Sequence, residues 1–149
     1  MLRHVIFLAL SFLFACASSR SDRLGGFGTD LGGWMVDAES VDMKFGVHRY
    51  QDRRAERFVL QELVRRNEEG QVVEWRELAT LNVPVRRDEF VLQGFECGSQ
   101  GRRGDVIAVG RGDADNLTII RAWRIDLTTK QFVPADPFAV TCEQADEEE

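Results

Sequence analysis

Few side chains in this sequence could do chemistry, and the histidines are the most limiting. The only two are His4, which lies in the N-terminal segment interpreted below as an export signal, and His48. A Ser-His or Cys-His mechanism in the rest of the chain would therefore depend on His48. The sequence has no G-x-S-x-G, H-E-x-x-H or P-loop motif. In the stretch FGVHRYQD, Tyr50 follows His48 by two residues, so a strand would place both side chains on one face. We interpret His48 as a surface residue of a strand and predict no catalytic residue.

Acidic side chains offer the main alternative, because a positioned pair of carboxylates can cleave a glycosidic bond. Four glutamates lie in or beside apolar segments: Glu62, Glu74, Glu77 and Glu96. Charged residues on a half-buried strand normally occupy its solvent face, so we expect these four to be solvated. A carboxylate-dependent hydrolase is therefore the alternative to a non-catalytic role, and it requires two acids that converge in one cleft.

The first fifteen residues have a composition unlike the rest of the chain. Arg3 and the terminal amine are positive, and the apolar run from Val5 to Ala15 is interrupted only by Ser11. This order of charge and apolar residues is typical of an export signal. As a helix, the run would span about 16 Å, roughly half of the apolar core of a bilayer, so we do not interpret it as a transmembrane anchor.

The apolar run ends in Leu13-Phe14-Ala15-Cys16. This resembles the lipobox of bacterial lipoproteins, in which leucine, a variable residue and a small residue precede a cysteine, although Phe14 is bulkier than the usual residue. The resemblance does not extend beyond the N-terminal segment. It implies cleavage before Cys16 and attachment of a diacylglycerol to its sulfur, which makes membrane lipid a partner. Because Ala17 and not an aspartate follows, it also implies the periplasmic face of the outer membrane.

The remaining chain divides into three parts. Residues 16–33 are the expected lipidated N-terminus and flexible linker, because 17–33 contain five glycines and three serines. Residues 34–142 are the expected domain. Residues 143–149 contain five carboxylates and are expected to be a disordered acidic tail.

Strand-forming patterns dominate residues 34–142. The clearest segments are RFVLQELV (57–64), QVVEWREL (71–78), EFVLQGFEC (89–97), DVIAVG (105–110) and NLTIIRAWRID (116–126). The best helical candidate runs from Arg53 to Arg66, but its apolar clusters favour a strand. The continuous apolar run 105–110 predicts a strand covered on both faces. The pattern predicts an all-β fold, a small antiparallel β-sandwich or barrel of one domain.

Even spacing within segment 116–126 predicts one shared face for four apolar residues. These are Leu117, Ile119, Trp123 and Ile125.

Two cysteines remain besides Cys16, namely Cys97 and Cys142. In an exported protein such a pair reaches a compartment where disulfides form. A bridge over this separation would stabilise the fold by about 4 kcal/mol. Two free thiols or a metal pair are the alternatives. A metal site would need two further soft ligands, and only His48 is available outside the N-terminal segment. We predict a disulfide, no metal and no cofactor.

The net charge of −6 argues against a nucleic-acid partner, which requires a basic face. Three tryptophans, Trp34, Trp75 and Trp123, could line a binding surface, but we expect at least two of them in the core. The sequence therefore predicts a lipid-anchored, non-catalytic β domain that binds an envelope protein or a glycan, or supports envelope structure. A narrower version, an inhibitor of lysozymes, rests on architecture alone.

Overall fold

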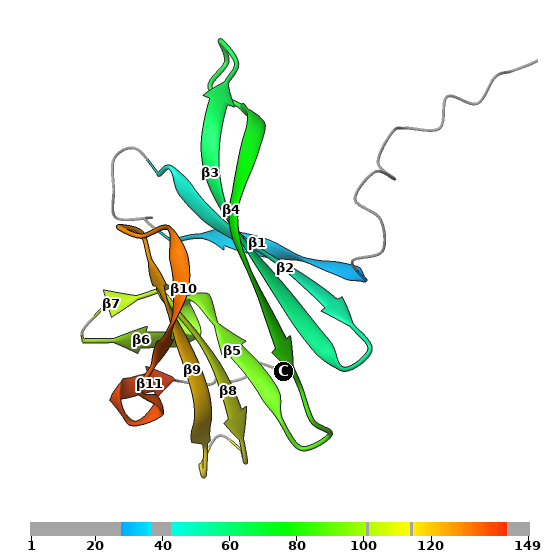
Figure 1. Cartoon of the computed structure of the whole chain (residues 1–149), viewed down its shortest axis with the longest axis vertical. Coiled ribbons are helices and arrows are strands. Elements are labelled where there is room, and N and C mark those ends of the chain that lie inside the picture. Colours follow the sequence, from blue (N-terminus) through cyan, green and yellow to red (C-terminus); the bar gives the residue numbers. More distant parts are fainter. Residues whose placement is uncertain (1–27, 37–42, 101, 114, 143–149) are drawn as a thin grey trace, which may run out of the picture.

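The computed structural model describes residues 28–36, 43–100, 102–113 and 115–142. The fold is all β and antiparallel, as predicted, and its sheets do not close into a barrel (Figure 1). Within the described part of the chain, no helix is long and apolar enough to cross a membrane. The predicted signal peptide, Cys16 and the acidic tail lie outside the described residues.

Three sheets make up the fold. Sheet A has the order β1-β2-β3-β4 and contains β1 (Thr29–Met35), β2 (Phe45–Asp52), β3 (Ala55–Arg66) and β4 (Val72–Pro84). Sheet B has the order β10-β9-β8-β5 and contains β5 (Phe90–Gln93), β8 (Val106–Arg111), β9 (Thr118–Asp126) and β10 (Gln131–Ala135). A small third sheet has the order β11-β6-β7 and contains β6 (Cys97–Ser99), β7 (Arg102–Arg103) and β11 (Val140–Cys142). Two 3-10 turns, η1 (Gly94–Glu96) and η2 (Pro137–Ala139), precede β6 and β11.

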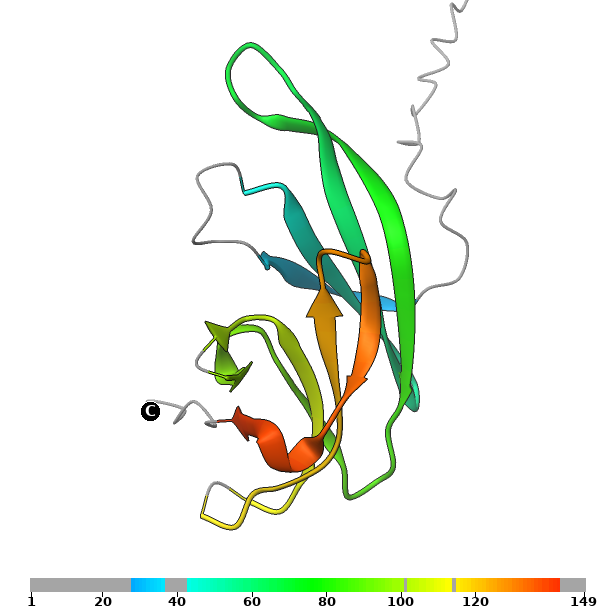
Figure 2. The same cartoon turned by 60° about the vertical axis from the view of Figure 1, so that its left-hand side comes forward.

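The main apolar cluster lies between sheets A and B. It includes Phe58 and Leu60 from sheet A and Ile107 and Val109 from sheet B. Figure 2 shows β10 beside β4, where the two sheets meet along one side. Facing sheets that share one apolar layer are the arrangement expected of a sandwich.

Strand β8 is covered on both faces, as its continuous apolar run predicted. Ile107 and Val109 belong to the main cluster, whereas Val106 and Ala108 belong to a second cluster on the opposite face of sheet B. The second cluster lies under the small third sheet and contains Cys97. Sheet B is therefore the central layer of the molecule.

Strand β9 corrects the prediction of one shared apolar face. Its register against β8 shifts between Val109 and Gly110, so that Ile120 is an extra residue in the ladder. Such a bulge exchanges the two faces of a strand. Leu117 and Ile119 consequently pack on the second cluster, while Trp123 and Ile125 belong to the main cluster side.

Strand β1 corrects the predicted extent of the linker, because the strand begins at Thr29 and not after residue 33. The glycines of this stretch permit close strand pairing. A Cβ on Gly33 would lie 2.3 Å from the carbonyl oxygen of Val47, and one on Gly28 would lie 2.0 Å from that of Gln51. Glycine here is required by the approach of a neighbouring backbone, and composition alone suggested flexibility.

Cys97 and Cys142 form a disulfide, as predicted. They lie directly opposite each other on β6 and β11, and Cys97 is 1% exposed. The bridge therefore ties β11, the last described strand, to β6 within the third sheet.

The loop between β4 and β5 is held by Glu89, whose side chain is only 2% exposed. A carboxylate oxygen of Glu89 accepts a hydrogen bond from Arg121 Nη2 at 2.7 Å and another from the backbone N–H of Arg86 at 3.1 Å. Arg121 also donates to the carbonyl oxygen of Pro84 at 2.8 Å. These contacts fix the position of the loop that follows β4.

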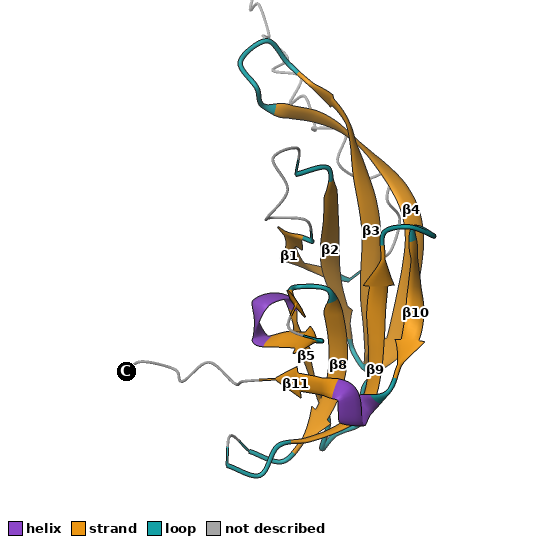
Figure 3. Cartoon of the chain, turned by 90° about the vertical axis from the view of Figure 1, so that its left-hand side faces the viewer, coloured by secondary structure: helices purple, strands orange, loops and turns teal. Residues whose placement is uncertain are grey.

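The segment from Arg53 to Arg66 is a strand for nearly all its length, as its pattern favoured. Past the point where β2 stops pairing with β3, strands β3 and β4 continue as a two-stranded arm, visible at the top of Figure 3. Val64, Val72 and Val73 in this arm are exposed.

Candidate functional site

The face of sheet A opposite the main cluster carries a groove of about 560 Å³. Side chains alternate across a sheet, so the cross-strand set Trp34, Val47 and Leu60 faces the cluster. The neighbouring set therefore faces the groove: Met35, Gly46 and Gln61.

The floor of the groove is formed by Gly33 and Gly46. A Cβ on Gly46 would lie 3.5 Å from Trp75 Cη2 and 3.5 Å from Met35 Sδ, which places these two side chains beside the bare backbone. Trp75 is 37% exposed, although large apolar residues are usually buried in a small domain. Gly46 is itself buried under these two side chains, whereas Gly33 is exposed, so the groove combines a stretch of open backbone at Gly33 with an aromatic wall.

His48 forms the polar side of the groove. Its Nε2 lies 2.6 Å from Asp30 Oδ1, and its ring stacks on Tyr50 with centroids 4.8 Å apart. Asp30 Oδ1 also accepts a hydrogen bond from the Gly32 N–H at 2.7 Å, and this bond, followed by His48, holds the pKa of Asp30 below its usual range. Burial, with a smaller contribution from the charge of Asp30, raises the pKa of Tyr50.

The shared face of His48 and Tyr50 was predicted, but the contact with Asp30 was not. Asp30 lies in the segment that composition assigned to the linker. The register of β1 shifts between Asp30 and Gly32, and this bulge brings the carboxylate to His48. The sequence signal that could have revealed it is Asp-Leu-Gly, where an aspartate two residues before a glycine can accept its N–H.

The tryptophans divide as expected, with two against the core. Trp34 packs on the main cluster and donates from Nε1 to the carbonyl oxygen of Gly104 at 2.9 Å. Trp123 also packs on the main cluster, with the Arg121 guanidinium 6.0 Å from its ring centroid. Trp75 is the one whose ring lines the groove as an exposed surface.

The four candidate glutamates do not come together at the groove. Glu62 accepts hydrogen bonds from Arg76 and Lys130, which hold its pKa below the usual range. Glu74 lies 3.4 Å from Arg65 in an exposed ion pair, and Glu96 accepts from the Gln93 N–H at 3.0 Å. None of the four, Glu77 included, lines the groove. Among the residues that the structure describes, no group of three or more His, Cys, Asp or Glu side chains could hold a metal ion.

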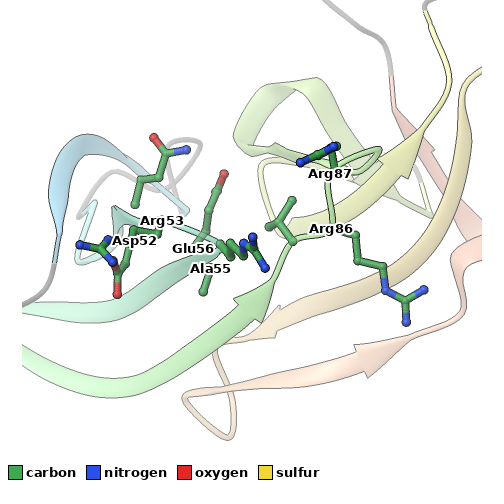
Figure 4. A pocket seen from close by; sticks show the side chains of 9 residues that line it. Asp52, Arg53, Ala55, Glu56, Arg86 and Arg87 are labelled. Atoms are coloured by element: carbon green, nitrogen blue, oxygen red, sulfur yellow. The ribbon is translucent and has the colours of Figure 1, made fainter.

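A second cavity, of about 640 Å³, lies between the β2–β3 turn and the loop after β4 (Figure 4). Two carboxylates line it, Asp52 and Glu56, but both oxygens of Glu56 accept hydrogen bonds from Arg49 at 2.7 Å. Glu56 is 6% exposed and acts as the buried half of this ion pair. The other charged residues that line this cavity are arginines: Arg53, Arg54, Arg86 and Arg87.

Comparison with known proteins returns nothing. No protein-family model, curated protein or solved structure matches this chain. The two cavities and the N-terminal sequence are the features of the chain that bear on its function.

Proposed function

We propose that this protein is a lipid-anchored binding module of the bacterial cell envelope, and that the groove on sheet A binds a glycan. The N-terminal sequence Leu13-Phe14-Ala15-Cys16 supports the anchor. By this proposal Cys16 carries the lipid and holds the domain at the periplasmic face of the outer membrane.

The observation that carries the glycan proposal is the exposed ring of Trp75 in the same groove as the exposed backbone of Gly33. A sugar ring has an apolar C–H face that packs on an indole ring, and its hydroxyl groups need hydrogen-bond partners. Gln61 and His48 supply polar groups along the same groove. Gly33 is exposed and has no side chain, so a flat ring can approach the backbone closely there.

The proposed role is binding without catalysis. Asp30 and His48 form a carboxylate–imidazole pair, and nucleophilic catalysis would require a hydroxyl or thiol within reach of it. The residues that line the groove carry no hydroxyl or thiol, and the neighbouring Tyr50 stacks its ring on the face of the His48 imidazole. The pair is better suited to fix the orientation of His48 toward a ligand.

Isothermal titration with solubilised peptidoglycan fragments and outer-membrane oligosaccharides tests the glycan proposal. We expect Trp75→Ala to weaken binding by about tenfold, which corresponds to about 1.4 kcal/mol. Phe138→Ala is the matched control, because Phe138 is an exposed aromatic residue far from the groove along the chain, at 97% exposure. Its affinity should equal that of the unchanged protein.

Two results would contradict the proposal. If an envelope protein or peptide competes for Trp75 while no sugar fraction binds, the ligand class is wrong. If protein purified from its native host retains residues 1–15 or has no added acyl mass, the lipid anchor is wrong.

A further inference from the structure

The cavity between the β2–β3 turn and the loop after β4 brings together basic residues that are distant in sequence. Arg53 and Arg54 come from the turn, and Arg86 and Arg87 come from the loop. Figure 4 labels Arg53 of the turn and the two arginines of the loop. The loop is attached to the turn by a backbone hydrogen bond of 2.8 Å from Val85 N to Arg54 O. Both segments therefore hold their charges at one end of the domain.

Most of the negative charge at this end is already engaged. Glu56 is paired with Arg49, and Glu89 pairs with Arg121 and lies 3.8 Å from Arg86. Across the described parts of the chain, no carboxylate lies within ion-pair distance of Arg53, Arg54 or Arg87. Asp52 is the remaining carboxylate of the lining, so the cavity has an excess of positive charge.

The chain also enters the fold at this end. Thr29, the first residue of β1, pairs with Gln51, which directly precedes the β2–β3 turn. Gly28 packs so closely on Gln51 that a Cβ would meet its carbonyl oxygen. Cys16 is therefore connected to this end by the twelve residues 17–28, a length that spans at most about 40 Å when fully extended.

We propose that the arginine end of the domain faces the membrane and that Arg53, Arg54 and Arg87 contact the phosphate groups of anionic phospholipids. This inference rests on the proposed lipid anchor, which would keep the arginine end within reach of the surface. Guanidinium groups bind phosphate oxygens with two parallel hydrogen bonds, so the chemistry of the two sides is complementary.

The attraction has to be local, because the whole chain has a net charge of −6. Charges more than about 10 Å from the surface are largely screened at physiological salt. Figure 1 shows the β2–β3 turn and the loop after β4 at one end of the described domain. An anionic surface would accordingly attract this end through its own arginines, whatever the net charge of the whole chain.

Vesicle binding by an unacylated chain isolates this contact from the anchor. The chain used is residues 16–149 with Cys16→Ser, which contains every described strand and both apolar clusters. Binding to phosphatidylcholine vesicles is compared with binding to vesicles that also contain phosphatidylglycerol. We expect binding only to the anionic vesicles, and a loss of about a hundredfold on the triple change Arg53→Gln, Arg54→Gln, Arg87→Gln.

The matched control removes three exposed arginines elsewhere: Arg65→Gln, Arg66→Gln and Arg102→Gln. Equal losses in the two triple variants would overturn the proposal, because the effect would then follow net charge and not position. Equal binding by the unchanged chain and the Arg53/Arg54/Arg87 variant would also overturn it. Competition by millimolar inorganic phosphate that abolishes vesicle binding would overturn it in favour of a site for a free anion.

The failure of this inference can be told apart from failure of the proposed function. Absence of acyl mass on the native protein overturns the anchor, whereas arginine-dependent vesicle binding by the unacylated chain would still support the surface contact. Loss of sugar binding in Trp75→Ala with unchanged vesicle binding would support two separate sites.

Discussion

Reduction of the Cys97–Cys142 disulfide is expected to lower the free energy of unfolding by about 4 kcal/mol. The bond closes a loop with a sequence separation of 45 residues, which contains β7 to β10 and most of sheet B. For a loop of this length, the chain-entropy relation gives a loss of about 13 cal/mol/K in the unfolded state, or about 4 kcal/mol at 25 °C. Small domains are stable by only about 5–15 kcal/mol, so this is a large share.

Urea unfolding of the oxidised and reduced protein measures the effect directly, with Cys16→Ser in both samples so that only one pair is oxidised. The midpoint should fall strongly, and the melting temperature should fall by about 15 °C, given about 2.1 cal/mol/K of unfolding entropy per residue. Cys97→Ala with Cys142→Ala should reproduce the reduced state. A difference below about 1 kcal/mol, measured under conditions where both forms unfold reversibly, would refute the entropic reasoning.

Four further substitutions are predicted, each measured by urea unfolding. Gly33→Ala should destabilise the fold by more than about 2 kcal/mol, because its Cβ would collide with the backbone of Val47. Gly46→Ala should fold normally, because its Cβ would make only ordinary van der Waals contacts with Met35 and Trp75; equal stability of the two variants would contradict the assigned strand packing. Glu89→Gln should lower the free energy of unfolding by about 2 kcal/mol, because Arg121 loses the buried carboxylate with which it pairs. The loss is limited because Arg121 is partly exposed and water can hydrate its guanidinium group. Burial raises the pKa of the Asp105 carboxyl, so its contribution to stability falls as pH rises from about 4 through the folded pKa. Asp105→Asn should therefore be more stable than the unchanged protein at neutral pH and equal to it in acid, and the reverse order would refute this.

Residue types with strong strand preference made most of the fold predictable. The four consecutive aliphatic residues 106–109, within the segment 105–110, can be buried only if both faces of the strand are covered, and both faces of β8 are covered. The two cysteines allowed one pairing, and the structure has that pairing. In each case the information is local, or there was only one way to combine the residues.

Features that depend on cross-strand register could not be predicted. The bulge at Ile120 exists because β9 pairs with β8 on both sides of it, and spacing within β9 alone gives the wrong faces. The groove likewise requires Gly33, Gly46 and Trp75 to meet from three strands, and no one segment records this. The contact between Asp30 and His48 could not be predicted, because the glycine-rich composition of this segment indicates a flexible linker. In the structure, glycine is required there by the close approach of the neighbouring backbone.

The arm of β3 and β4 gives one strand two different kinds of protection. From Glu56 to Leu60, β3 is mostly buried and pairs with β2 on one side and β4 on the other. From Val64 to Arg66 it is exposed and pairs with β4 alone. Amide hydrogens in the first part should exchange with solvent only when the whole domain opens, and those in the second part should exchange through fraying of the arm. The residues at the tip, Asn67 to Gln71, are consequently where a protease could cut the chain while the remaining sheets stay folded.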